Sequence, residues 1–114
     1  FNSGKHTRDF SYIDDVVISI IKILKKENKL KKYQILDIGK SKSDKLISLI
    51  RYIENFSQKK FKIIKKKKQI GDVNSTFSNN KNLFKLINFK PNTPLKVGIQ
   101  HFVNWYKDYK KIKK

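Results

Sequence analysis

The hydrophobic positions near the start of the chain follow the two periods that distinguish strands from helices. Phe10 and Tyr12 alternate with polar neighbours, which predicts a short strand. Apolar residues at helical spacing then predict a helix at about 15–26, which Asp14 or Asp15 can cap by accepting the free amides of its first turn. Because this helix is apolar over much of its circumference, we expect other parts of the protein to cover it on more than one side.

The same two periods continue through the middle of the chain. The run 33–38 predicts a buried strand that is closed by Gly39. Ser43 or Asp44 then begins a second helix, in which apolar residues recur at helical spacing to about residue 57. A strand, a helix and a second strand in this order are typical of a right-handed crossover in a parallel sheet.

The second half of the chain predicts one more strand and two more helices. Phe61, Ile63 and Ile64 indicate the strand, and a short helix follows near 79–87. Asn88 is expected to end that helix in the left-handed conformation, which Asn tolerates better than most residues. A last helix is predicted at about 94–110. The chain is therefore predicted to be an α/β protein.

This α/β pattern does not make a complete sheet, because too few strands are predicted to cover the helices. The chain also contains no Met and no glycine-rich phosphate loop. We interpret it as the back portion of a larger enzyme, that is, as an incomplete domain.

Composition narrows the possible functions. Without Cys, disulfides, thiolate metal sites and cysteine nucleophiles are excluded. The net charge of +19 suggests a polyanion partner, but of the 28 basic residues only Arg8 and Arg51 are arginine, the residue favoured for bidentate phosphate contacts. We interpret the lysine excess chiefly as a coding bias at surface positions, with nucleic-acid binding as the alternative.

Two segments resemble familiar functional motifs, but the surrounding sequence argues against a function for either of them. Gly39-Lys40-Ser41 follows a predicted strand, but the first glycine of a phosphate loop would fall at Gln34. Tyr106 and Lys110 have the spacing of a dehydrogenase Tyr-Lys pair, but they lie in a lysine-rich tail where that spacing arises by chance. His101 is expected to be a surface or packing residue.

Two positions are candidate binding residues. Arg8 lies at the predicted junction of a loop and a strand, where a guanidinium suits a diphosphate; the alternative is an ion pair with Asp9. In the loop 69–76, Gly71 allows close approach of the backbone and Asp72 can accept two hydroxyl hydrogen bonds, as a ribose offers. The alternative there is an ordinary Gly-Asp turn.

Taken together, the ordered motifs of the chain resemble a known family. They are Arg8-Asp9-Phe10-x-Tyr12-Ile13-Asp14-Asp15, Gly71-Asp72-Val73-x-x-Thr76, Phe89-x-Pro91-x-Thr93-x-Leu95-x-x-Gly98-Ile99 and Phe102-Val103-x-Trp105-Tyr106. This set is similar to the C-terminal portion of extended short-chain dehydrogenases/reductases of the NAD-dependent epimerase/dehydratase family. Within that family, UDP-glucuronate 4-epimerases are the closest resemblance. Ser78-Asn79 departs from it, since an Ala-Asp pair is usual there.

The resemblance implies a substrate-binding role for three residues. Arg8 would contact the UDP diphosphate, and Asp72 the uridine ribose. Gln69 stands where related 4-epimerases often carry a phosphate-binding arginine, and glutamine there is typical of the glucuronate branch. The family moves a hydride from sugar C4 to bound NAD and returns it to the opposite face. The catalytic residues and the NAD loop would lie in the preceding part, so no catalytic, cofactor-binding or metal-binding residue is assigned in this chain.

The resemblance also implies an organisation and a setting. Residues 1–42 would be the tail end of a Rossmann-like domain, and 43–114 a small α/β subdomain that binds the nucleotide sugar. The full-length enzyme would be a cytoplasmic homodimer that serves cell-surface polysaccharide biosynthesis, with no membrane partner, and this part would be inactive alone. A lysine-rich polyanion-binding module and a decayed remnant remain the alternatives.

Overall fold

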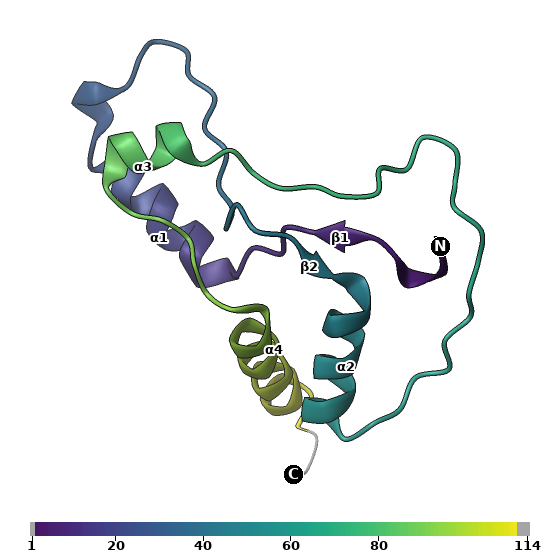
Figure 1. Cartoon of the computed structure of the whole chain (residues 1–114). Helices are drawn as coiled ribbons and strands as arrows, with labels where there is room; N and C mark the ends of the chain where they lie inside the picture. The colour runs from purple at the N-terminus through teal and green to yellow at the C-terminus, as the bar shows by residue number, and fades with distance from the viewer. Residues whose placement is uncertain (1, 112–114) are drawn as a thin grey trace.

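The computed structural model describes residues 2–111 and confirms the four predicted helices (Figure 1). Their bounds are Ile13–Leu24 for α1, Leu46–Ser57 for α2, Lys81–Ile87 for α3 and Leu95–Tyr109 for α4. Short 3-10 turns occur at Asn2–Gly4 and Glu27–Lys29. Asn88 ends α3 with φ of 48°, and its backbone N–H donates to the carbonyl of Phe84, as the left-handed cap predicted from the sequence requires.

The strands differ from the prediction. The sheet pairs β1 (Thr7–Arg8) with β2 (Asp44–Lys45) in antiparallel register, and Thr7 also bridges to Ser75 in parallel. The predicted strands at 10–12, 33–38 and 61–64 are absent from this described part of the chain. A strand exists only where a neighbour completes its backbone hydrogen-bond ladder, and among residues 2–111 no such ladder forms along these three runs.

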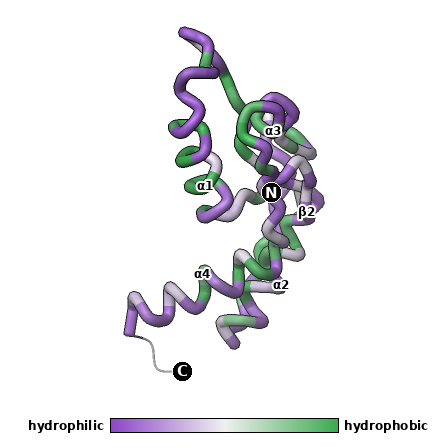
Figure 2. The backbone as a smooth tube through the Cα atoms, turned by 90° about the vertical axis from the view of Figure 1, so that its left-hand side faces the viewer, coloured by the Kyte–Doolittle hydropathy of each residue, from purple (hydrophilic) through white to green (hydrophobic). Residues whose placement is uncertain are grey.

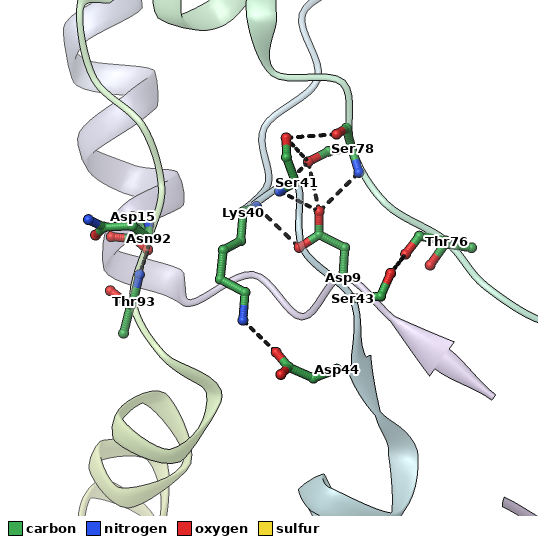
Figure 3. A network of polar contacts seen from close by, with 10 residues as sticks. All are labelled: Asp9, Asp15, Lys40, Ser41, Ser43, Asp44, Thr76, Ser78, Asn92 and Thr93. Atoms are coloured by element: carbon green, nitrogen blue, oxygen red, sulfur yellow. Dashed lines mark hydrogen bonds and ion pairs between the residues drawn. The ribbon is translucent and has the colours of Figure 1, made fainter. Parts of the chain in front are cut away.

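The acidic residues at the start of α1 also differ from the prediction. Asp14 and Asp15 both lie inside the first turn, and the N-cap position is Tyr12, which makes no side-chain cap hydrogen bond. Asp15 is buried, and its Oδ2 accepts the backbone N–H groups of Asn92 (3.1 Å) and Thr93 (2.9 Å). The Asp15 carboxylate therefore ties α1 to the segment before α4 instead of capping its own helix (Figure 3).

The helices form two pairs, with α1 against α3 and α2 against α4, and the small sheet lies between the pairs (Figures 1 and 2). The buried hydrophobic side chains of the core among the described residues are few: Leu83, Ile87, Leu95 and Val103. The radius of gyration is 17.1 Å and the shape is flat, 50 × 40 × 18 Å. A compact chain of about 100 residues has a radius of about 13 Å. The architecture is therefore open.

Large apolar surfaces remain exposed as a result. On α1, where Figure 2 shows hydrophobic residues along the whole helix, six aliphatic side chains are 40–65% exposed: Ile13, Val17, Ile18, Ile20, Ile21 and Leu24. Tyr33 (81%) and Ile35 (71%) of the run predicted as a buried strand are exposed as well. No helix of the described residues is both long and apolar enough to cross a membrane.

One carboxylate joins the segments that surround the sheet (Figure 3). Asp9 Oδ2 accepts the backbone N–H groups of Ser41 and Ser78 (2.9 Å each) and the Ser78 hydroxyl (2.7 Å), while Oδ1 accepts the N–H of Lys40 (3.1 Å). A Cβ at Gly39 would lie 2.8 Å from Ser78 Cβ and 3.0 Å from Asp9 Oδ2, so only glycine fits beside this cluster. Asp9 therefore holds three distant segments together and does not pair with Arg8.

Replacing Asp9 is expected to destabilise the fold. In Asp9→Asn the new NH2 group faces backbone N–H donors and cannot accept from them, so the free energy of unfolding should fall by about 2 kcal/mol. Urea unfolding measures this change. The matched control is Asp108→Asn, which removes the same charge from an exposed position of α4 and should stay within about 0.5 kcal/mol of the parent. Equal effects of the two substitutions would contradict the role of Asp9.

Candidate ligand-binding site

Strand β1 brings two side chains to one side of the sheet. His6 and Arg8 are two residues apart in extended chain, so they point to the same face. The backbone around them is fixed on both sides. Thr7 donates to Asn74 (3.0 Å) and accepts from Thr76 (3.3 Å), and the carbonyl of His6 accepts the N–H of Leu46 (3.0 Å).

Arg8 and Asp72, which the sequence indicates separately, meet at this face. Arg8 Nη2 donates to Asp72 Oδ1 at 2.8 Å, and Nη1 donates to the carbonyls of Thr7 (2.8 Å) and Asn74 (3.3 Å). The Arg8 side chain keeps 28% of its surface exposed and the Asp72 side chain 26%. Both groups therefore stay accessible to a ligand while they hold each other in place.

His6 completes the cluster and was missed by the sequence analysis. It is only 5% exposed, and its Nε2 lies 3.3 Å from Asp72 Oδ2. The one signal in the sequence was its position two residues before Arg8, which places both side chains on the same face wherever the backbone is extended. The Asp72 carboxylate is thus contacted at one oxygen by Arg8 of β1 and at the other by His6, the residue just before β1.

Gln69 lies beside the cluster without entering it. The Gln69 side chain is exposed. The backbone carbonyl of Gln69 accepts the backbone N–H of Asp72 at 3.3 Å across a turn. Gly71 has φ of 82° in this turn, a conformation that strains other residues. Lys68 extends toward the same loop and donates to Asn74 Oδ1 at 2.8 Å, which adds a cation near Arg8.

The Gly39-Lys40-Ser41 turn offers no phosphate site. A phosphate at such a turn would need the free N–H groups of Lys40 and Ser41, and the Asp9 carboxylate already accepts both of them (Figure 3). The Lys40 side chain is engaged in an ion pair with Asp44. Nor do the described residues contain a group of three His, Cys, Asp or Glu that could hold a metal ion.

A concave surface lies where α1 begins and α4 passes it. The groove has a volume of about 610 Å³, and its lining includes Phe10, Leu49, Ile99 and Trp105.

Tyr12 and His101 meet at this groove. Burial, assisted by the neighbouring carboxylates of Asp14 and Asp15, raises the pKa of the Tyr12 phenol, so the phenol stays protonated. It lies 3.0 Å from His101 Nδ1 with the rings edge to face at 5.6 Å, so His101 is a packing residue at the surface, as predicted.

No protein-family model matches this chain. Known proteins are nevertheless similar to it in sequence over nearly its whole length. Protein CapI of Staphylococcus aureus is 32% identical over 126 residues, which cover 97% of this chain and 38% of that protein. The UDP-glucuronate 4-epimerase of Thermodesulfobacterium geofontis is 31% identical over 109 residues, which cover 95% of this chain and 32% of that enzyme.

Solved structures share the fold. The UDP-glucuronic acid 4-epimerase of Bacillus cereus, in complex with UDP-glucuronic acid and NAD, matches with a TM-score of 0.75 at 24% identity over 96% of this chain and 34% of that chain. The UDP-glucose 4-epimerase of Thermotoga maritima with UDP-glucose matches with a TM-score of 0.79 at 19% identity, over 96% of this chain and 34% of that chain.

The fold is thus that of part of the epimerases of the extended short-chain dehydrogenase/reductase class, in agreement with the α/β prediction. The predicted resemblance to UDP-glucuronate 4-epimerases is also confirmed by the curated relatives that carry this name. The chain spans only about a third of the length of these proteins.

The contact between Arg8 and Asp72 can be measured without a ligand. In a double-mutant cycle of Arg8→Ala and Asp72→Ala, we expect a coupling energy of about 0.5–1 kcal/mol, because both side chains are about a quarter exposed and solvent screens the pair. The cycle is measured by urea unfolding at low and high salt, and the coupling should shrink as salt is added. Strictly additive substitutions at low salt would contradict the pairing.

Proposed function

We propose that this chain is the C-terminal, substrate-binding part of an NAD-dependent nucleotide-sugar epimerase that interconverts UDP-glucuronate and UDP-galacturonate at C4. The observation that carries the proposal is that one chain combines an Arg8–Asp72 cluster with similarity, over 95% of its length, to a UDP-glucuronate 4-epimerase. In this proposal the chain supplies residues that bind the nucleotide sugar, and it has no epimerase activity alone.

The chemistry of the cluster suits the middle of a UDP-sugar. A guanidinium presents planar, paired donors that match phosphate oxygens, so Arg8 would hold the diphosphate. A carboxylate has about four lone-pair sites, and Arg8 and His6 approach one on each oxygen. Two sites remain on Asp72 for the two hydroxyls of a ribose. Because the ribose and diphosphate of UDP are adjacent, one ligand can contact both residues.

Gln69 is proposed as the third substrate-binding residue. It lies on the exposed rim of the same loop, and its amide can donate to a phosphate oxygen without adding charge. Lys68, which is fixed to Asn74 on the same side, supplies a cation near that position.

The described residues do not fit NAD. No glycine-rich loop is present in the sequence, and the one turn that resembles a phosphate loop is filled by Asp9. We therefore derive no step through NAD in this chain, and we assign NAD and the catalytic groups to the part of the enzyme that precedes it.

The exposed apolar surfaces support a division of the chain into parts of two different domains. We propose that residues 1–42 complete a Rossmann-like domain, whose preceding strands and helices would cover α1 and pair with the run 33–38. Residues 43–114 would form the nucleotide-sugar-binding subdomain. The full-length enzyme would be a cytoplasmic homodimer that serves cell-surface polysaccharide biosynthesis.

The full-length protein and this chain alone, incubated with UDP-glucuronate and NAD, test the proposal directly. We expect UDP-galacturonate from the full-length protein and none from the chain. A full-length protein that binds no UDP-sugar would contradict the proposal. If that protein instead bound DNA with an affinity that falls steeply with salt, the lysine-rich polyanion-binding alternative would be favoured.

Arg8 is the residue whose loss should weaken binding most. In the full-length protein, Arg8→Ala should raise the dissociation constant for UDP by about 10- to 100-fold, because charge-assisted hydrogen bonds to the diphosphate are lost. Isothermal titration calorimetry measures the change. The control is Arg51→Ala, the only other arginine of the sequence, which is exposed on α2 and should leave the affinity unchanged. Equal losses in both variants would indicate a non-specific charge effect.

A further inference from the structure

His6 is a buried polar side chain whose contacts call for an explanation. It is 5% exposed, and its Nε2 has no hydrogen-bond partner among the described residues. Buried polar atoms are nearly always hydrogen bonded, so an atom without a partner marks either a special role or a bond that forms only in another state. Nε2 lies 3.3 Å from Asp72 Oδ2, a distance suitable for an ion pair, but the two atoms lack hydrogen-bond geometry.

The position of His6 leaves it little freedom to move away from Asp72. The His6 carbonyl accepts the N–H of Leu46, and the next residue, Thr7, is bonded to the backbone at 74 and 76. Asp72 is held less tightly, since its backbone lies in the turn after Gly71 and its side chain is 26% exposed. Of the two groups, the carboxylate is the one that can shift to complete the bond.

We propose that His6 is a positioning residue for nucleotide binding, which donates from Nε2–H to Asp72 Oδ2 and orients the carboxylate toward the ribose hydroxyls. Arg8 holds Oδ1 from the other side, so the carboxylate is fixed between two donors that lie two residues apart in sequence. Its two remaining lone-pair sites then face the ligand. This inference rests on the proposed function, because it assumes that the ligand carries a ribose beside a diphosphate.

The contact is expected to shorten when the nucleotide binds. Hydrogen bonds at binding sites are often long in the free protein and tighten in the complex. Two hydroxyl donors that approach the open lone pairs of Asp72 would fix its rotamer, and Oδ2 would then align with the His6 Nε2–H. A purely packing role for His6 would need only a side chain of similar volume and no donor.

The experiment measures how strongly the full-length protein prefers UDP to 2′-deoxy-UDP, which lacks one ribose hydroxyl. The variants are His6→Leu and His6→Met, which fill the space without a donor, and His6→Gln, whose amide NH2 can take the place of Nε2–H. The control is His101→Leu, which alters the other histidine, at the surface of α4. Melting temperatures are recorded for all variants, so that a loss of stability is seen separately.

We expect the parent to prefer UDP, and His6→Leu or His6→Met to reduce this preference by about three- to tenfold, as loss of one oriented hydrogen bond would. His6→Gln should restore most of it, and His101→Leu should not change it. If the donor-free variants weaken both nucleotides equally, or if His6→Gln behaves like His6→Met, the positioning role is wrong while the proposed function stands. If the parent binds neither nucleotide, the proposed function itself fails.

Discussion

The hydrogen bonds of the Asp9 carboxylate are the interactions on which the proposed binding face depends, that is, the face formed by His6, Arg8 and Asp72. The carboxylate accepts four hydrogen bonds from two segments that are far apart in sequence, Lys40-Ser41 and Ser78. One carboxylate can accept from all these N–H groups only while the segments keep this arrangement. Any other arrangement would leave N–H groups without a partner, which raises the free energy of the folded chain. Ser78, where the family resemblance suggests alanine, strengthens the cluster with its hydroxyl. β1 is therefore held in place directly beside the residues that would meet a ligand.

Arg8, the last residue of β1, and Asp9, which follows it, have different roles. Asp9 faces the cluster that joins the segments, whereas Arg8 faces Asp72 on the other side, as alternation along an extended chain requires. This alternation is why the pairing of Arg8 with Asp9, considered from the sequence, does not occur. The acidic pair in the first turn of α1 also has divided roles, because successive side chains of a helix point in different directions. Asp15 points inward to the segment at 92–93, while Asp14 is exposed.

The sequence predicted well what depends on neighbouring residues and poorly what depends on distant ones. Helix periods and the left-handed Asn88 are local properties, and both were correct. The strand at 33–38 was not, because alternating hydrophobic residues form a strand only beside a partner. In the binding face, Arg8 and Asp72 were each indicated by their chemistry and by the family resemblance. Their contact was not predicted, and neither was the burial of His6. Residue 72 is more than 60 positions from His6 and Arg8 in the sequence, and it meets them only in the folded chain.

The binding face and the exposed apolar surfaces are built by different forces, and this separates their roles. The face around β1 is held by backbone hydrogen bonds and by carboxylates with several donors, which fix geometry closely. The surface of α1 carries aliphatic side chains that lack cover among the described residues, and hydrophobic contact is favourable with almost any partner of matching shape. If a preceding domain covers α1, it would therefore add stability without rearranging the contacts of His6, Arg8 and Asp72. Nucleotide binding would then depend on the polar cluster, and the integrity of the domain on the apolar surface.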